Sequence, residues 1–187
     1  MRFIPTEFQG LFVIEPTVHS DERGFFLETF REELFVAQGL AFKALQANQA
    51  FSAAAGVLRG LHFQAPPKTQ AKLVWVTKGQ ALDVVVDLRK NSPTFGKHYS
   101  LLLSAENFRR LFVPKGFAHG YITLGSNVEF NYMVDEYYSP VHEGGLLWND
   151  PALGINWGLG EIVAPQAPTV APRDAAWPCL KDLDNPF

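Results

Sequence analysis

An arginine and a histidine lie three residues apart in an apolar segment of β-type sequence, residues 56–64. In a regular strand Arg59 and His62 would point to opposite faces, because side chains alternate. Gly60 lies between them and permits a bulge that would turn both to one side. Histidine titrates near neutral pH and can act as an acid, a base or a metal ligand. A core histidine beside a surface arginine is the structural alternative, and this segment alone leaves both interpretations open.

A second histidine, His119, follows the sharp-turn sequence Pro-Lys-Gly-Phe-Ala at residues 114–118. This spacing is a device of cupin-type barrels, which deliver a histidine at the start of a strand. Metal-binding cupins supply two histidines one residue apart and a glutamate, but here His62 is followed by Phe63 and Gln64. Three or four metal ligands are hard to assemble from two isolated imidazoles. We therefore expect a cupin that holds no metal.

The elements that must position these residues are nearly all β-strands. Short β-favouring segments alternate with turns rich in Gly, Pro and Asn, and only residues 31–38 have helical character, ending before Gly39. Strands are predicted at residues 11–15, 25–30, 43–50, 57–63, 72–77, 80–88, 97–103, 109–113, 118–124 and 127–135. The polar residues 19–24 predict a turn that joins the first two strands into a hairpin. The pattern predicts an all-β fold, a cupin-type jelly-roll barrel with a short peripheral helix and an irregular C-terminal tail from residue 164.

The strand predicted at residues 80–88 carries two carboxylates. Its alternation places Leu82 and Val84 on one face, predicted to be core, and Asp83 and Asp87 on the other. The two aspartates are predicted to face solvent, and a polar cavity inside the barrel is the alternative.

Composition narrows the class of protein. With 187 residues, 47% hydrophobic and 19% charged, the chain is expected to form one domain over residues 1–187. A net charge of −3 disfavours a nucleic-acid partner. No apolar run approaches the roughly 20 residues of a membrane span, so no membrane partner is expected. The single Cys179 and an N-terminus without a signal pattern predict a cytoplasmic protein.

Several short segments occur in a characteristic order along the chain. They are Asp-Glu-Arg-Gly-Phe-Phe at 21–26 with Glu28, Leu-Arg-Gly-Leu-His-Phe-Gln at 58–64, Ser-Pro-Thr-Phe-Gly at 92–96, Pro-Lys-Gly-Phe-Ala-His-Gly at 114–120, Tyr-Tyr-Ser-Pro at 137–140 and Trp-Asn-Asp-Pro at 148–151. In these segments the chain resembles the dTDP-4-dehydrorhamnose 3,5-epimerase family, the sugar epimerases of L-rhamnose synthesis. The resemblance covers roughly residues 5–178. It implies a dTDP-4-keto-6-deoxy sugar as substrate, no cofactor, and a homodimer in which the N-terminal strands pair with the partner chain.

The resemblance also implies catalytic roles that the reaction itself explains. Inverting a carbon beside a ketone requires a base, a positive donor for the enolate oxygen, and an acid on the opposite face. By resemblance His62 is the base and Asp174 is the carboxylate that orients it. Lys72 stands where the family's enolate-binding lysine lies. Tyr132 matches the acid, and a phenol with a pKa of about 10 stays protonated at neutral pH.

A nucleotide-sugar carries a pyrophosphate, which calls for bidentate guanidinium donors. The resemblance implies substrate contacts from Arg23, Glu28, Gln46, Asn48, Arg59, His119, Tyr138, Glu143 and Arg173. The chain departs from the family pattern at Arg173, where lysine is common, and at Ala47, Gln49 and Met133. These departures concern the detailed substrate rather than the class of reaction.

The leading prediction is inversion of C3 and C5 of dTDP-4-keto-6-deoxyglucose, giving dTDP-4-keto-L-rhamnose. One alternative is a single-centre epimerase of another nucleotide-linked 4-keto-6-deoxy sugar. A second is a non-catalytic sugar-binding cupin, which would keep Arg23 and Arg59 but lose the base or the acid. A third is a metal-dependent dioxygenase or isomerase, against which the missing ligands weigh.

Overall fold

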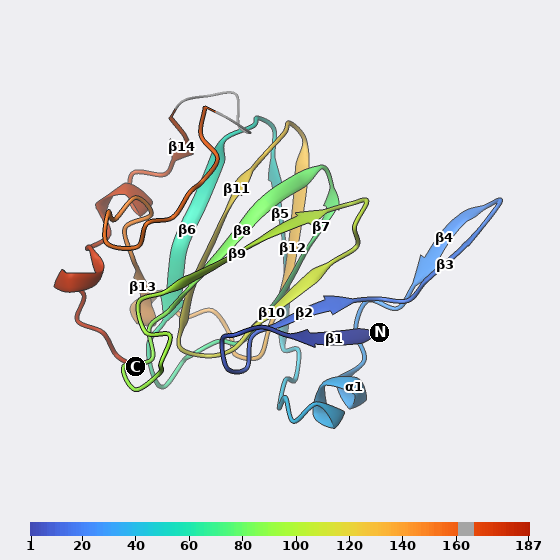
Figure 1. Ribbon diagram of the computed structural model, residues 1–187, viewed down its shortest axis with the longest axis horizontal. Helices are drawn as coiled ribbons and strands as arrows, with labels where there is room; N and C mark the ends of the chain where they lie inside the picture. Colours follow the sequence, from blue (N-terminus) through green and yellow to red (C-terminus); the bar gives the residue numbers. More distant parts are fainter. Residues whose placement is uncertain (161–166) are drawn as a thin grey trace.

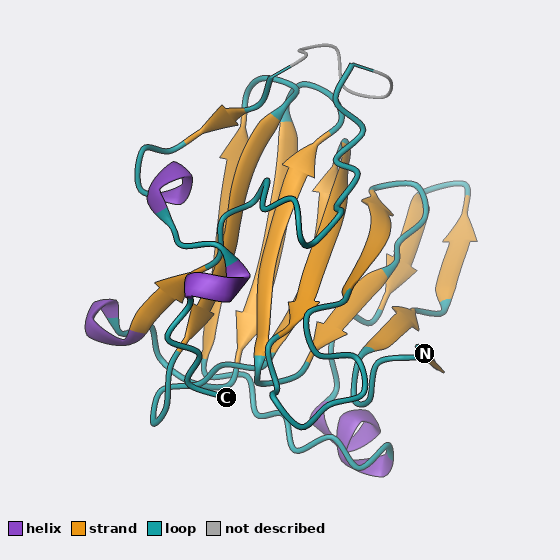
Figure 2. Cartoon of the chain, turned by 60° about the vertical axis from the view of Figure 1, so that its left-hand side comes forward, coloured by secondary structure: helices purple, strands orange, loops and turns teal. Residues whose placement is uncertain are grey.

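Two large antiparallel sheets face each other and enclose the interior of a barrel (Figures 1 and 2). The computed structural model describes residues 1–160 and 167–187. The first sheet runs in the order β1 (Arg2–Pro5), β2 (Phe12–Glu15), β10 (Arg110–Val113), β7 (Lys72–Lys78), β12 (Val128–Val134) and β5 (Gln46–Ser52). The second runs in the order β13 (Glu143–Gly145), β6 (Val57–Gln64), β11 (Phe117–Thr123), β8 (Gln80–Asp87) and β9 (His98–Ser104). This architecture is the cupin jelly roll that the sequence predicted.

The predicted strands are present, with ends displaced by at most three residues, but the predicted hairpin has the wrong partner. Strand β4 (Gly24–Leu27) pairs with β3 (Val18–Asp21), whereas β2 pairs with β1 and β10. The sequence of β3 is polar and mostly exposed, so it has no apolar alternation that would mark it as a strand. The β3–β4 hairpin projects away from the barrel (Figure 1).

The helix α1 (Glu32–Ala37) lies within the predicted residues 31–38 and at the edge of the molecule, as expected. Its one buried side chain, Phe35, fits among aromatic rings, with centroids 5.1 Å from Phe3 and 5.7 Å from both Phe42 and Phe112. These contacts fix the helix against the outer side of the first sheet. They leave the interior of the barrel to the strands.

Strand β8 is buried on both faces, so the prediction that Asp83 and Asp87 face solvent is wrong. Both carboxylates are fully buried. The face of Val84 packs beneath segments near the C-terminus, including Leu183 and Phe187, and the opposite face therefore points into the barrel. There the Asp87 carboxylate is paired with the Arg89 guanidinium at 2.8 Å, while Asp83 lies behind His119, which lines the cavity described below.

The C-terminal tail is mostly irregular, as predicted, but it also adds a short strand to the second sheet and lines part of the cavity. Residues 164–166 lie outside the described residues. Beyond them β14 (Thr169–Val170) pairs in parallel with β6, and the 3₁₀ turns η2 (Asp174–Ala176) and η3 (Leu180–Asp182) follow. A further 3₁₀ turn, η1 (Pro140–His142), precedes β13. None of the described helices is long and apolar enough to cross a membrane.

Candidate active site

A cavity of about 630 Å³ opens into the barrel between the two sheets, with one wall completed by the C-terminal tail. Strand β6 supplies one wall, β12 and β7 supply the facing wall, and β14 with η2 closes one side. The cavity gathers nearly all the site residues predicted from the sequence: Gln46, Asn48, Arg59, His62, Lys72, His119, Tyr132, Tyr138, Glu143, Arg173 and Asp174. Arg23 and Glu28 are absent from its walls.

A bulge in β6, which Gly60 permits, turns Arg59 and His62 to the same side. His62 lies opposite His119 and Arg59 lies opposite Tyr121, so two residues of β6 face one residue of β11. Gly60 has a φ of +131°, and a Cβ on it would lie 2.6 Å from the Gly120 Cα. Only glycine fits this close approach of two backbones.

His62 and Asp174 form a hydrogen bond, with 2.8 Å between Nε2 and Oδ1. The second oxygen of Asp174 accepts a hydrogen bond from the Gly60 backbone N–H at 3.1 Å. Burial opposes ionisation of Asp174, but the hydrogen bonds from His62 and Gly60 outweigh it and hold the pKa of the carboxyl below its ordinary value. An ionised Asp174 accepts the Nε2 proton, which leaves the Nδ1 lone pair of His62 free to act as a base.

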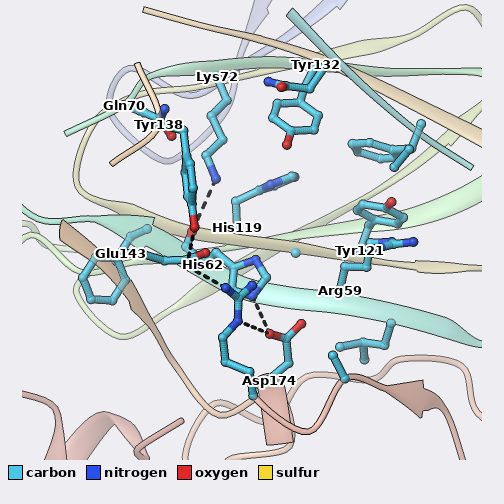
Figure 3. Close-up of a pocket in the computed structure, with 18 of the residues that line it drawn as sticks. Arg59, His62, Gln70, Lys72, His119, Tyr121, Tyr132, Tyr138, Glu143 and Asp174 are labelled. Atoms are coloured by element: carbon cyan, nitrogen blue, oxygen red, sulfur yellow. Dashed lines mark hydrogen bonds and ion pairs between the residues drawn. The ribbon is translucent and has the colours of Figure 1, made fainter. Parts of the chain in front are cut away.

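Tyr132 reaches the cavity from the sheet that faces His62, and Figure 3 shows the two side chains on opposite sides of the space. Its neighbours point outward, because Asn131 hydrogen-bonds Thr77 on the outer surface and Met133 packs in the aromatic cluster beneath α1. This is the alternation that the sequence predicted for β12. Burial raises the pKa of the Tyr132 phenol, which therefore keeps its proton at neutral pH.

Lys72 extends along the cavity between these two walls (Figure 3). Its Nζ lies 3.4 Å from the backbone carbonyl oxygen of His62, a long contact that leaves the ammonium available to a ligand. Its position deep in the barrel lowers the pKa of Lys72 to about 8, while the carboxylates of Asp83 and Glu143 act in the opposite direction. The amine is therefore mainly protonated at neutral pH.

A polar network lies at the mouth of the cavity. The Tyr138 hydroxyl donates to Glu143 at 2.9 Å, and the Arg173 guanidinium donates to the same carboxylate oxygen at 2.6 Å. The side-chain oxygen of Gln46 accepts from the Tyr138 backbone N–H at 3.1 Å, and its amide donates to Asn48 at 2.9 Å. These groups are half-buried or exposed, as expected of residues that meet a ligand on entry.

Arg23 and Glu28 lie on or beside the β3–β4 hairpin, away from the cavity of their own chain. The Arg23 side chain is 83% exposed and pairs with Asp21 in the same hairpin. Glu28 pairs with Arg31 near the start of α1. The contacts of these two residues with the substrate therefore stay a prediction, because neither residue lines the cavity of its own chain.

Three features of the cavity were not predicted from the sequence. The Asp83 carboxylate lies 2.8 Å from His119 Nε2, and the rings of Tyr121 and Phe130 stack with centroids 3.8 Å apart. Gln64 braces the loop after β12, because its side chain accepts a hydrogen bond from the Ser139 backbone N–H at 2.6 Å. A polar Gln64 and Asp83 inside otherwise apolar strands were the available signals.

Within residues 1–160 and 167–187, no three His, Cys, Asp or Glu side chains are grouped so that they could hold a metal ion. The nitrogens of His62 and His119 that point toward carboxylates are already engaged, by Asp174 and Asp83. The described residues of the cavity supply acids, bases and hydrogen-bond donors.

Known proteins are similar to this chain in sequence and in fold. A family model described as dTDP-4-dehydrorhamnose 3,5-epimerase matches residues 5–182. The chain is 45% identical over 181 residues to the dTDP-4-dehydrorhamnose 3,5-epimerase of Methanothermobacter thermautotrophicus, a match that covers 97% of this chain and 95% of the relative. It is 44% identical over 183 residues to the enzyme of the same name from Salmonella typhimurium, and the match covers 96% of each chain.

A solved structure extends the likeness to the fold. The dTDP-6-deoxy-D-glucose-3,5-epimerase of Legionella pneumophila, in complex with dTDP-4-keto-L-rhamnose, superposes with a TM-score of 0.91 at 41% identity. That match covers 98% of this chain and 94% of the other. Sequence, fold and cavity agree, and the chain belongs to the dTDP-4-dehydrorhamnose 3,5-epimerase family of carbohydrate isomerases.

Proposed function

We propose that the protein inverts C3 and C5 of dTDP-4-keto-6-deoxyglucose and releases dTDP-4-keto-L-rhamnose, with His62 as the base and Tyr132 as the acid. Membership of the family supports the reaction. The observation that carries the residue assignment is the position of an oriented His62 on one wall of a cavity and a protonated Tyr132 on the facing wall. Removing a proton from one face and returning one to the other face is what inversion requires.

His62 begins each inversion by taking the proton from the carbon beside the C4 ketone. The C–H bond breaks, the proton moves to His62 Nδ1, and the electron pair passes through the carbon framework to the ketone oxygen. Asp174 stabilises the imidazolium that forms, because its carboxylate lies 2.8 Å from Nε2. A general base of this kind contributes about 10²–10⁴ to the rate.

Lys72 meets the charge that develops on the ketone oxygen. Its ammonium makes one long contact with a carbonyl oxygen. A hydrogen bond to the enolate oxygen therefore displaces only this weak interaction. A preorganised donor in a cavity sheltered from water stabilises an enolate more strongly than water does. Tyr132 then gives its proton to the carbon from the opposite face, and the configuration at that carbon is inverted.

The remaining polar residues of the cavity suit a nucleotide diphosphate. Arg59 and Arg173 provide guanidinium groups for the pyrophosphate. The exposed ring of Tyr138 and the amides of Gln46 and Asn48 offer stacking and hydrogen bonds at the cavity mouth. Glu143 ties Arg173 to Tyr138, so these two groups are held in place before the ligand arrives.

The proposal includes a homodimer and a cytoplasmic location. The β3–β4 hairpin carries Phe25 and Phe26, 61% and 71% exposed, beside Arg23. Exposed aromatic rings on a projecting hairpin favour contact with another protein surface. Packing of this hairpin on a partner chain would bring Arg23 toward the partner's cavity. It would also explain why Arg23 does not line the cavity of its own chain. Light scattering at micromolar concentration should give the dimer mass, and a monomer mass would contradict this part.

The decisive experiment is NMR of dTDP-4-keto-6-deoxyglucose incubated with the protein in heavy water. We expect deuterium at both C3 and C5 and accumulation of the doubly inverted sugar. Deuterium and inversion at one carbon alone would identify a single-centre epimerase. Absence of exchange at both carbons would identify a sugar-binding protein without catalytic activity.

A further inference from the structure

The buried carboxylate of Asp83 has no role in the reaction described so far. It lies on β8, is fully buried, and points into the barrel. One oxygen contacts His119 Nε2 at 2.8 Å, and the other, Oδ1, is buried without a hydrogen-bond partner among the described residues. Burying a carboxylate is strongly unfavourable unless a positive charge compensates it. Asp83 therefore requires a cation nearby.

The ammonium of Lys72 is the cation in this part of the barrel: its Nζ lies 3.4 Å from the backbone carbonyl oxygen of His62, the residue opposite the His119 that Asp83 contacts. Four groups face it from the neighbouring strands: Asp83 from β8, Glu143 from β13, His62 from β6 and His119 from β11. Both carboxylates raise the pKa of Lys72, and Asp83 is the one that is fully buried. Glu143 is in addition engaged by Arg173 at 2.6 Å, which neutralises much of its charge. Asp83 is thus the main buried counter-charge of the amine.

Asp83 also fixes the orientation of His119. Burial lowers the pKa of His119, so the imidazole is neutral near pH 7 and carries one proton. A carboxylate at 2.8 Å from Nε2 selects the tautomer with the proton on Nε2. His119 then presents the lone pair of Nδ1, a hydrogen-bond acceptor that suits a sugar hydroxyl.

We propose that Asp83 is a positioning residue for the enolate-binding side of the cavity: it orients His119 and supplies the buried negative charge that compensates the ammonium of Lys72. This inference rests on the epimerisation proposed above, in which Lys72 stabilises the enolate. Two buried aspartates then have different tasks. Asp174 serves the base, and Asp83 serves the groups that bind the ketone oxygen and the sugar.

Asp83→Asn tests the charge, because asparagine keeps the size of the side chain and an oxygen that accepts the His119 N–H. Without the charge, the pKa of Lys72 should fall by about one unit or more, and the basic limb of the kcat/KM profile should move to lower pH by the same amount. At pH 8, where the protonated fraction of Lys72 would fall from about one half to about one tenth, the turnover should fall about fivefold. Asp135→Asn is the matched control, since Asp135 is a nearly buried carboxylate paired with Lys115 outside the cavity. It should leave the limb in place.

NMR of the protein without substrate gives an independent answer. The ¹⁵Nζ titration of Lys72, assigned with Lys72→Gln, should move down in Asp83→Asn and stay unchanged in Asp135→Asn. Long-range ¹H–¹⁵N spectra of the wild-type imidazoles should show His119 protonated on Nε2 near pH 7. An unchanged Lys72 titration in Asp83→Asn would overturn the proposal, and so would a proton on Nδ1 of His119.

Two features keep the test decisive. Should Asp83→Asn fail to fold, Asp83→Glu retains the charge and is expected to keep the Lys72 titration near the wild-type value, so a fall of about one unit would contradict the proposal. If the wild-type protein does not turn over dTDP-4-keto-6-deoxyglucose, the function proposed above has failed. The two titrations still report the role of Asp83 in that case, because they need no substrate.

Discussion

Two histidine–aspartate pairs lie at the same cavity, with their histidines on neighbouring strands. They have similar geometry but differ in burial and in the element that supplies the carboxylate. His62 and His119 lie directly opposite each other on β6 and β11, and each has a carboxylate oxygen 2.8 Å from Nε2. The partner of His62, Asp174, lies 112 residues away in the C-terminal tail. The partner of His119, Asp83, lies 36 residues away on the adjacent strand β8.

The burial of each histidine, rather than its aspartate partner, determines which of the two can act as a base. The His62 side chain is 23% exposed to the cavity, whereas the His119 side chain is 8% exposed. Burial lowers the pKa of His119 and disfavours the imidazolium that a base must become. His62 can reach a substrate and hold a proton, while His119 is suited to accept a hydrogen bond. The comparison therefore separates a base from a binding group of the same residue type.

Replacing each histidine in turn gives the largest expected contrast. His62→Asn should reduce turnover and deuterium exchange at C3 by about 10²–10⁴, because the base is lost while a polar side chain remains. His119→Asn should weaken binding but retain exchange. Exchange rates followed by NMR in heavy water decide the question. Wild-type exchange in His62→Asn would mean that another residue, His119 first, is the base.

Tyr132→Phe should separate proton removal from inversion. His62 remains, so deuterium should still enter at C3, but the inverted product should form far more slowly because the acid on the opposite face is missing. Tyr99→Phe is the control, since Tyr99 is a half-buried tyrosine of β9 outside the cavity. Product analysis beside exchange measures both steps. Normal epimerisation by Tyr132→Phe would remove Tyr132 from its assigned role.

Much of this fold could be predicted from local patterns. Strands such as β6, β7 and β12 alternate or run apolar between clear turn residues, and their positions are correct to within three residues. Strand β3 was missed because Val18–Asp21 is polar and exposed, so nothing in its sequence marks a strand. The burial of Asp83 was predicted wrongly because it depends on the tail covering the far side of β8, which is a long-range contact.

The catalytic site required knowledge that local patterns do not contain. Resemblance to the family supplied Asp174, Lys72 and Tyr132, which come from three separate elements and meet only in the folded barrel. For Arg59 and His62 the sequence left two interpretations open, and the bulge that Gly60 permits is the one that the structure has. Arg23 and Glu28 remain predictions, because a single chain does not bring the hairpin to its own cavity.

A single added methyl group at Gly60 should disrupt the bulge of β6 against β11. Gly60→Ala would place a Cβ 2.6 Å from the Gly120 backbone at a φ of +131°, a clash and backbone strain that together should cost roughly 2 kcal/mol or more in unfolding free energy. The Tm should fall by about 4–8 °C in a chain of this size. Gly125→Ala is the matched control, since a Cβ there meets nothing within 4 Å. Equal melting temperatures for the two variants would show that the bulge tolerates a side chain.

The smallest expected effect is that of chelation, which should leave activity unchanged. A metal bridging the two pairs would need ligands in addition to His62 and His119, each of which directs Nε2 to a carboxylate and offers only Nδ1. The ammonium of Lys72 lies beside them and repels a cation, and the part of the chain that the structure describes offers no cluster of three ligating side chains. Exhaustive EDTA treatment followed by the heavy-water assay should give the wild-type rate. Loss of turnover that a single added metal restores would recast the two histidines as ligands of one ion, and the separation of base from binding group would no longer hold.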